Sequence, residues 1–248
     1  MSEQKKISII VVARNEIQTI ANTLNNIISQ DFKDFDLIVI DGNSTDGTTA
    51  VIKRFERHIS SFICEEDRNL YEAMNKGINI SKSEWILFMN SGDLFFDKKT
   101  LSYLNKQINR VEGESVIIGN SIIKYPNYNI VISSNKNPLQ FVHQATLYKK
   151  KLHEIFGMYL VDNSITISDY IFFNQIPKQE IKIIDRIISI NSAGGVSSKS
   201  DSLFQKIFYD FLMQKVSKAE LIIILIFYPF YKVSKNLILN LKSLITKT

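Results

Sequence analysis

Hydrophobic residues in the first hundred positions follow two periods in turn. Continuous apolar runs, typical of strands covered on both faces, lie at 7–12, 36–40, 61–64 and 85–89. Between these runs apolar residues recur at helical spacing, first as Ile20, Leu24, Ile27 and Ile28, then as Val51, Ile52 and Phe55, and then through 70–80. This alternation predicts right-handed βαβ units, and therefore an α/β fold with a largely parallel sheet.

The second half of the chain has a less regular pattern. Strand-like runs lie at 115–118, 129–133 and 181–190. Past position 200 two helical stripes flank the apolar run 221–231, and the first stripe comprises Leu203, Phe204, Ile207, Phe208, Phe211 and Leu212. We therefore expect one domain over 1–200 and a tail of amphipathic helices over 201–248.

Composition narrows the class of protein. The chain has 248 residues, of which 45% are hydrophobic and 22% charged, so it can bury a sizeable core and is not disordered. Its single cysteine, Cys64, excludes an internal disulfide framework and a Cys-rich zinc module. The apolar segment 7–13 is too short to span a bilayer and no cleavage site follows it, so we expect the catalytic domain to be cytoplasmic.

The net charge of +5 lies in the tail. Positions 199–248 hold eight lysines and three acidic residues, which leaves the first 198 residues neutral. A domain that binds nucleic acid would carry a basic face of its own, so we expect no nucleic-acid partner.

Polar clusters follow each of the first four predicted strands. They are Arg14-Asn15-Glu16, the segment 41–47 (DGNSTDG), the segment 65–68 (EEDR) and the segment 90–93 (NSGD). Each alone is compatible with ordinary turn chemistry. Because open α/β sheets bind ligands outside the carboxyl ends of their strands, four such clusters predict a ligand site at that edge.

Taken in order, these motifs resemble a known family. The series VVARNE, VIDGNSTDGT, EEDRNLYEAMNKG, WILFMNSGD, HQA, SDYIFF and GGVS is similar to family 2 glycosyltransferases, in particular those that build bacterial capsule, exopolysaccharide and O-antigen. The resemblance covers about 7–197. It implies the GT-A fold, which is a Rossmann-like three-layer α/β fold with a mostly parallel mixed sheet, here followed by C-terminal amphipathic helices.

The resemblance also implies a set of residues that bind a nucleotide-sugar donor. Asp41 would read the base, which a carboxylate can do by accepting the imide N–H of uracil, and the region around Asn15 would line its other side. Arg68 offers a guanidinium to phosphate, and Lys76 either faces the diphosphate or is a solvated helix lysine. The whole set comprises Ala13, Asn15, Glu16, Asp41, Asp67, Arg68, Asn75, Lys76, Asn90, Ser91, Asp93 and His143.

Segment 90–93 occupies the family's DxD position, where a divalent cation bridges carboxylate and diphosphate. Asn90 replaces the first acidic residue, which leaves Asp93 as the one certain carboxylate. We expect Mg²⁺ or Mn²⁺ held by Asp93 together with phosphate and water oxygens, and the alternative is a tight turn capped by Asp93.

By the same resemblance, the general base is Asp169. The family usually has Glu-Asp at the start of this helix, whereas here the pair is Ser168-Asp169, followed by four apolar residues. The alternative is a carboxylate that only stabilises the helix N-terminus. His143 would orient the diphosphate, reach a metal or be structural, and the segment 194–197 resembles the flexible glycine segment of this subgroup.

The tail predicts a membrane contact. Its apolar run 221–231 is eleven residues long, short of the roughly 20 that span a bilayer. Lysines beside apolar stripes favour an in-plane anchor on an anionic membrane surface, peripheral on the inner face of the bacterial plasma membrane. The alternative is a helical pair that packs on the sheet or on a second subunit in a homodimer.

The sequence therefore predicts an inverting glycosyltransferase that moves a sugar, most favourably from a UDP-sugar, to a saccharide on a lipid diphosphate. A nucleotidyltransferase would need a glycine-rich loop after the first strand, which 14–16 lacks. A membrane-docked scaffold with a decayed site is suggested by Asn90 and by Ser168 in place of the glutamate. The lack of any GxGxxG motif argues against a dehydrogenase.

Overall fold

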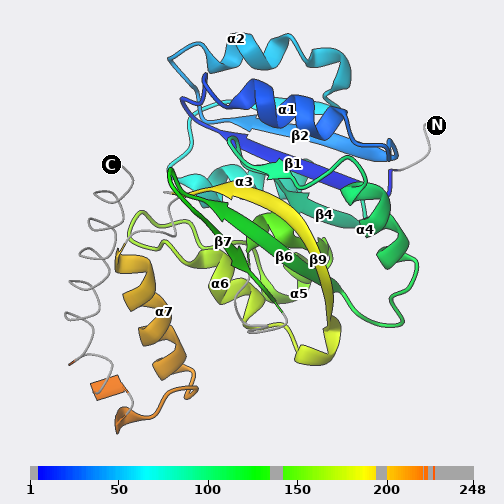
Figure 1. Cartoon of the computed structure of the whole chain (residues 1–248). Coiled ribbons are helices and arrows are strands. Elements are labelled where there is room, and N and C mark those ends of the chain that lie inside the picture. Colours follow the sequence, from blue (N-terminus) through cyan, green and yellow to red (C-terminus); the bar gives the residue numbers. More distant parts are fainter. Residues whose placement is uncertain (1–4, 135–141, 194–199, 220, 223–225, 227–248) are drawn as a thin grey trace.

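The computed structural model describes residues 5–134, 142–193, 200–219, 221–222 and 226. It is an α/β fold built on one mixed sheet (Figure 1). The strands are β1 Ile7–Ala13, β2 Phe35–Asp41, β3 Ser61–Cys64, β4 Trp85–Phe88, β5 Leu94–Phe95, β6 Val116–Lys124, β7 Asn129–Ile132, β8 Thr146–Lys149 and β9 Ile181–Ser192. The α-helices are α1 Ile20–Ile28, α2 Thr48–Lys53, α3 Leu70–Ile80, α4 Thr100–Ile108, α5 Leu152–Phe156, α6 Ser168–Phe173 and α7 Ser200–Leu212, and 3₁₀ turns cover Glu56–His58, His143–Ala145 and Lys178–Glu180.

The order of the strands divides the sheet into two halves. The order is β3-β2-β1-β4-β8-β6-β9-β5, with β7 paired to β6. The first four strands are parallel to one another, as the sequence predicts. β8 then runs antiparallel between β4 and β6, and β9 is parallel to β6. The GT-A-like mixed sheet that the sequence predicts is therefore present.

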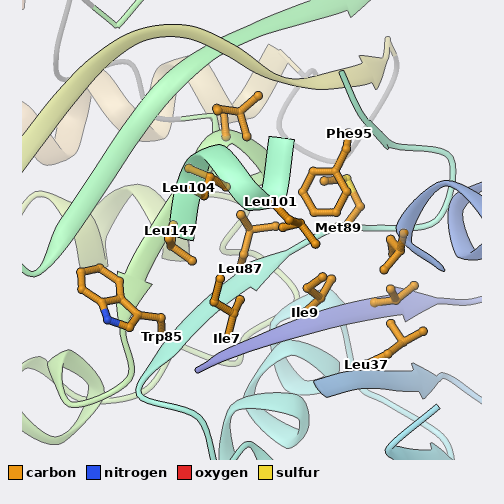
Figure 2. Close-up of a cluster of buried hydrophobic side chains, with 14 of the residues drawn as sticks. Ile7, Ile9, Leu37, Trp85, Leu87, Met89, Phe95, Leu101, Leu104 and Leu147 are labelled. Carbon is orange, nitrogen blue, oxygen red and sulfur yellow. The ribbon is translucent and has the colours of Figure 1, made fainter. Parts of the chain in front are cut away.

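Alternation along β1 places a core on each face of the sheet. Ile7, Ile9 and Val11 pack with α1, α4 and Trp85, and Figure 2 shows part of this cluster. Ile10 and Val12 point to the other face, where they join residues of α3, α5 and α6. Because successive side chains of a strand point to opposite faces, one buried strand serves two layers of helices. The result is the three-layer arrangement.

Several elements lie where the sequence predicts them, and the structure adds elements that the sequence pattern does not predict. The helix expected over 70–80 is α3, and the strands expected in the second half are β6, β7 and β9. The sequence analysis did not predict α4 or β8. α7 forms over the first predicted stripe of the tail, whereas the expected glycine segment 194–197 and most of 221–248 lie outside the described residues. In the part of the chain that the structure describes, no helix is both long enough and apolar enough to cross a bilayer.

Gly77 sets how closely α3 approaches the sheet. A Cβ atom added there would lie 2.4 Å from Cγ2 of Ile10 and 3.5 Å from Ile40. Ile10 is fully buried and β-branched, so its methyl group has no space to withdraw into. We therefore expect Gly77→Ala to lower the free energy of unfolding by about 1–3 kcal/mol, even though alanine favours helix.

Equilibrium urea unfolding measures this loss. Gly113→Ala is the matched control, because no atom lies within 4 Å of its added Cβ. That variant should stay within about 0.5 kcal/mol of the parent. Equal stability of the two variants would contradict the close packing of α3 on β1.

Candidate active site

The carboxyl ends of the first four strands meet at one edge of the sheet. Ala13 pairs with Asp41, and Asp41 pairs with Cys64. Beyond β4 the chain continues along β1, since the amides of Met89 and Ser91 donate to the carbonyls of Ile10 and Val12. The four polar clusters predicted from the sequence therefore lie side by side.

The loops after β1 and β2 are tied together by side chain to backbone hydrogen bonds. The amide of Asn15 donates to Ser44 Oγ at 2.8 Å, and the amide of Thr45 donates to Asn15 Oδ1 at 2.9 Å. Asn15 itself has φ +56°, in the left-handed region that asparagine tolerates. The amide of Glu16 donates to Thr48 Oγ1 at 2.7 Å. Asn15 and Glu16 therefore shape this edge as well as lining it.

Asp46 adds a further link between the same loops. Its carboxylate accepts from the amide of Ile17 at 3.1 Å and from the hydroxyl of Thr48 at 2.6 Å. The Thr48 hydroxyl is the main cause that lowers the pKa of Asp46. The sequence analysis gave Asp46 no role beyond turn chemistry, and its partner Ile17 lies on a different loop.

Asp41 is fully buried at the end of β2. Its carboxylate accepts from the hydroxyls of Ser44 and Thr49, the latter at 2.5 Å, and from the thiol of Cys64 at 3.5 Å. Burial raises the pKa of the Cys64 thiol, and the charge of Asp41 adds to that effect, so the thiol keeps the proton that it donates. Asp41 therefore holds its own loop in the described structure.

Asp67 and Lys76 form an ion pair beside this loop. Lys76 Nζ lies 2.6 Å from Asp67 Oδ1 and 2.9 Å from Glu65 Oε1, and it donates to the carbonyl of Glu66 at 3.0 Å. Burial acts to lower the pKa of Lys76, but the two carboxylates outweigh it and raise that pKa. Lys76 is thus a paired lysine at the edge of the sheet rather than a solvated one.

Gly42 lies where the loop after β2 closely approaches the side chains of Asp67 and Arg14. A Cβ at this position would lie 3.1 Å from Asp67 Oδ2 and 3.3 Å from Cδ of Arg14. The Arg14 guanidinium in turn lies 3.4 Å from the carbonyl of Asp67. The ends of β1, β2 and β3 therefore converge on a position where only glycine fits without displacing a neighbour.

Arg68 and Asn75, two residues of the predicted donor-binding set, are hydrogen-bonded to other residues of the protein. The Arg68 guanidinium is largely exposed and pairs with Glu72, one turn further along, at 2.8 Å. Hydrogen bonding to Glu72 raises the pKa of Arg68. The side-chain Nδ2 of Asn75 donates to the Tyr159 carbonyl at 2.8 Å, and its Oδ1 accepts from the backbone amide of Tyr159 at 3.1 Å. Asn75 therefore joins α3 to the segment before α6.

Segment 90–93 forms a turn beside α1. Ser91 Oγ lies 3.0 Å from Thr19 Oγ1, which donates to the Glu16 carboxylate at 2.5 Å. Asp93 is 7% exposed and accepts from Gln144 Nε2 at 2.7 Å and from the Ser192 amide at 3.3 Å. Burial raises the pKa of Asp93 to about 7, and the nearby charge of Glu16 acts in the same direction.

The oxygen atoms of this turn suit a hard cation in part. Asn90 Oδ1 is buried and has no hydrogen-bond partner, and the Asp93 carboxylate follows three residues later. Mg²⁺ and Mn²⁺ prefer such oxygen ligands. Within the described residues, no group of three or more His, Cys, Asp or Glu side chains is arranged to hold a metal ion. These residues therefore fit a cation that takes most of its ligands from the substrate and from water.

A cavity of about 250 Å³ opens next to the turn. Its lining comes from α1 and the residues just before it, from the turn 90–93 and β5, and from the ends of β6 and β9: Gln18, Thr19, Asn22, Gly92, Leu94, Lys124, Ile190 and Ser192. Lys124 contributes a cation and Gly92 stands at φ +92°, a backbone conformation that favours glycine.

Asp169 lies at the start of α6 with an ordered set of partners. Its Oδ1 accepts from the Tyr71 hydroxyl at 2.9 Å, and its Oδ2 lies 3.6 Å from Nδ1 of His143. Its side chain is 28% exposed, so the carboxylate remains accessible. Burial acts to raise its pKa, but His143 and Tyr71 outweigh burial and lower it, so Asp169 is ionised at neutral pH.

Tyr71 and Gln144, which contact the two carboxylates, carry no signal in the sequence that marks them as partners. Gln144 lies in the HQA motif, whose histidine alone was considered. Tyr71 is 98 positions from Asp169 and lies on the buried face of α3, where its aromatic ring reads as core. His143 contacts Asp169, not the turn 90–93, which is held by its neighbour Gln144.

The model of the family named Glycosyl transferase family 2 matches residues 8–167. The chain belongs to this family. The match includes β1 to β4 with their polar edge, His143 and Gln144, and it ends two residues before Asp169.

Curated relatives are similar over part of their length. A PGL/p-HBAD biosynthesis glycosyltransferase of Mycobacterium bovis is 27% identical over 159 residues, covering 61% of this chain and 62% of that protein. UDP-Glc:alpha-D-GlcNAc-diphosphoundecaprenol beta-1,3-glucosyltransferase WfaP of Escherichia coli is 31% identical over 127 residues, covering 50% of this chain and 46% of that protein. The chain thus spans about half to three fifths of the length of these relatives.

Solved structures confirm the fold. S. aureus TarS 1-349 in complex with UDP-GlcNAc superposes with a TM-score of 0.69 at 18% identity, covering 82% of this chain and 64% of that one. The mannosyltransferase PcManGT from Pyrobaculum calidifontis, in complex with GDP-Man and Mn2+, gives a TM-score of 0.66 at 19% identity, covering 85% and 65%. At these identities the likeness establishes the architecture that the sequence predicts.

The pKa of Asp93 gives a pH test of the turn. Since its folded pKa of about 7 exceeds the ordinary 3.8, the folded state binds this proton more tightly than the unfolded state does. The stability contributed by Asp93 is full below about pH 4 and is lost as pH rises to about 7. Relative to Asp93→Asn, the metal-free parent should lose about 2–3 kcal/mol between pH 5 and pH 8, measured by urea unfolding. Parallel pH curves for the two proteins would show that Asp93 titrates like an exposed carboxylate.

Proposed function

We propose that this chain is an inverting glycosyltransferase that moves a sugar from a nucleotide diphosphate donor to a hydroxyl of a saccharide acceptor. The observation that carries the proposal is that two different carboxylate sites are contacted by neighbouring residues, Asp93 by Gln144 and Asp169 by His143. One is the turn 90–93, which can meet a diphosphate, and the other is Asp169, which is ionised, accessible and oriented by two partners.

The donor would lie over the loops after β1, β2 and β3. Asp41, with Ala13, Asn15 and Glu16 beside it, would receive the base, and a uracil imide N–H suits a carboxylate acceptor. Reading a base at Asp41 requires its loop hydroxyls to yield one oxygen, since both are engaged. The names of similar proteins support this class of donor, because TarS was solved with UDP-GlcNAc and with UDP, and PcManGT with GDP-Man.

A divalent cation would be held by Asp93 and the unpartnered Oδ1 of Asn90. When bound, such a cation stabilises the negative charge that builds up on the leaving diphosphate. The likeness to PcManGT, solved with Mn2+, supports this proposal, and the hard oxygen ligands favour Mg²⁺ or Mn²⁺. Lys76 and Arg68, although paired in the described structure, add positive charge on the same side.

Asp169 would act on the acceptor. The acceptor hydroxyl oxygen forms a bond to the anomeric carbon while its proton passes to the Asp169 carboxylate. The bond from the anomeric carbon to the diphosphate oxygen breaks, and its electron pair leaves with the diphosphate. An attack from the face opposite the leaving group inverts the configuration of the anomeric carbon. Tyr71 and His143 stabilise the ionised form that this step requires.

We expect Asp169→Asn to reduce transfer by about 10²–10⁴ while donor affinity is retained, because asparagine keeps the shape and loses the basicity. Asp93→Ala should instead lose metal-dependent donor binding and turnover together. Calorimetric titration of UDP-sugars with Mn²⁺, followed by single-turnover transfer from the donor that binds, separates the two effects.

Asp34→Asn is the matched control, since Asp34 is exposed before β2 and pairs with Lys5. It should transfer at the parent rate. Transfer by Asp169→Asn at the parent rate would remove Asp169 from the mechanism. Donor binding without turnover on any acceptor would favour the scaffold that the sequence also allows.

The acceptor we propose is a saccharide on a lipid diphosphate, as in bacterial surface polysaccharide synthesis. The name of the similar E. coli enzyme WfaP supports it, because that enzyme acts on a diphosphoundecaprenol acceptor. α7 gives structural support. It contacts α6 and the segment just before it through polar side chains, including Tyr170 with Asp210 at 2.8 Å and Thr166 with Ser202 at 2.8 Å.

Four large apolar residues of α7, Leu203, Phe204, Phe208 and Leu212, are exposed in the described structure. Phe208 is 48% exposed and Leu212 is 61% exposed. Each lysine close to an anionic surface adds about 1 kcal/mol of attraction, and the whole net charge of +5 lies past 198. We therefore place α7 and the lysine-rich tail against the anionic inner face of the plasma membrane.

Replacing two residues of this face tests the contact. Phe208→Glu with Leu212→Glu should abolish co-sedimentation of the full chain with anionic vesicles, because each glutamate adds charge where apolar area would be buried. Gln175→Glu is the control, because Gln175 is exposed just after α6 and the substitution likewise introduces a glutamate. It should leave co-sedimentation intact. Unchanged vesicle binding in the double variant would contradict the assignment, and a change of oligomeric state would show that α7 packs on a second subunit.

A further inference from the structure

A continuous chain of polar groups runs through the core beneath Asp169. Nε2 of His143 lies 3.1 Å from the Tyr159 hydroxyl, which lies 2.8 Å from the Tyr148 hydroxyl. The Tyr148 hydroxyl lies 3.0 Å from Nε2 of His153, and Nδ1 of His153 lies 3.0 Å from the Gly157 carbonyl. Each of the four side chains in this polar network is at most 8% exposed.

The direction of these hydrogen bonds is set from the Gly157 end. A carbonyl only accepts, so Nδ1 of His153 carries a hydrogen and donates. Burial lowers the pKa of His153 to about 4, so the ring is neutral and its Nε2 has a free lone pair. The Tyr148 hydroxyl therefore donates to His153.

The same reasoning passes along both tyrosines. Tyr148 has one hydroxyl hydrogen, already given to His153, so its oxygen accepts from Tyr159. The Tyr159 hydrogen is used in turn, so its oxygen accepts from His143. Burial raises the pKa of Tyr148 and that of Tyr159 well above the ordinary tyrosine value, so neither hydroxyl gives up its proton. The row of hydrogen bonds from Gly157 to His143 therefore requires a hydrogen on Nε2 of His143.

This requirement fixes what faces Asp169. If Nε2 of His143 carried the only hydrogen of the ring, the lone pair of Nδ1 would face the Asp169 carboxylate at 3.6 Å. We propose that Nδ1 of His143 is protonated as well, so that a positive ring faces the Asp169 carboxylate at 3.6 Å, and that His143, oriented by Tyr159, Tyr148 and His153, is the positioning residue that keeps Asp169 an oriented carboxylate. This inference rests on the proposed role of Asp169 as general base.

The surroundings leave few other sources of charge. The ring of His143 packs edge-on against Phe88 and Phe173, which separate it from water. Tyr71 of α3 donates to the other oxygen of Asp169, and Lys206 of α7 contributes a weaker attraction. His153 adjoins Lys150, whose charge opposes protonation of the ring and so supports its neutral form. Protonated His143 is therefore the main partner of Asp169.

This arrangement explains how a buried aspartate stays ready to accept a proton. The positive ring stabilises the carboxylate before the acceptor arrives. As the acceptor O–H bond breaks, its proton passes to the Asp169 carboxylate, and His143 keeps the proton on its Nδ1. The charge of the pair changes by one, and the polar chain behind His143 is undisturbed.

Nitrogen-15 NMR of the histidine rings tests the proton positions directly. The chain has only three histidines, His58, His143 and His153, so long-range ¹H–¹⁵N spectra are tractable, and His143→Gln identifies the His143 signals. At pH 7 we expect both ring nitrogens of His143 to be protonated, and His153 to be neutral and protonated on Nδ1 alone. A His143 ring that lacks a proton on either nitrogen would overturn the inference.

Tyr148→Phe tests the chain from two links away. Without the Tyr148 oxygen, the Tyr159 hydroxyl is free to donate to Nε2 of His143, so the ring becomes neutral and carries its hydrogen on Nδ1. Loss of the positive charge beside Asp169 should raise the midpoint of its ¹³C-detected carboxyl titration by about 1–3 pH units. An unchanged titration midpoint, or an unchanged His143 tautomer, would overturn the inference.

Tyr103→Phe is the matched control, because Tyr103 packs in the cluster on the other face of the sheet. It should leave the Asp169 titration unchanged. These measurements need no donor, so they fail or succeed independently of the proposed function. Full transfer by Asp169→Asn would reject the base role alone, whereas the NMR result decides the position of the proton.

Discussion

Parallel pairing of β1 between β2 and β4 is the constraint on which the rest of the structure depends. The register places Ala13 opposite Asp41, and the chain after β4 continues hydrogen bonding to the end of β1. Because parallel strands present all their carboxyl ends at one edge, loops separated by dozens of residues become neighbours. β1 is buried along its whole length, and a one-residue slip of register would move each of its side chains to the opposite face of the sheet. Fold stability and site geometry therefore rest on the same pairings.

The proposed acceptor side of the site depends on a second packing layer. α3 and α6 cover one face of the sheet, and Tyr71 of α3 reaches Asp169 of α6. Behind them His143, Tyr159, Tyr148 and His153 bring polar groups into an aromatic core, where each is satisfied by the next. Buried polar groups without partners would be costly, so this network specifies one arrangement of the helices. The same contacts that order the core also orient the proposed base.

Local patterns predicted much of the first hundred residues and less of the rest. α3 was predicted at its observed bounds because its apolar spacing and flanking polar residues agree, and Asn69 accepts from the amide of Glu72 at its start. β8 was not predicted because four residues carry little periodicity, and its place between β4 and β6 follows from long-range pairing. Asp169 was identified by resemblance, while its partners Tyr71 and His143 lie 98 and 26 positions away in the sequence. The two interpretations of Lys76 could not be separated, since its partners Glu65 and Asp67 lie on a loop whose path the sequence pattern does not define.

The central claim is that a donor held at the carboxyl edge is attacked from the opposite face by an acceptor activated at Asp169. The most direct measurement is the anomeric configuration of the product, read from ¹H coupling constants after transfer from an α-linked UDP-sugar to a diphosphoundecaprenol-linked saccharide. The account predicts a β-linked product, because a single displacement inverts the anomeric carbon. An α-linked product, or no transfer from any UDP-sugar of a panel, would contradict it.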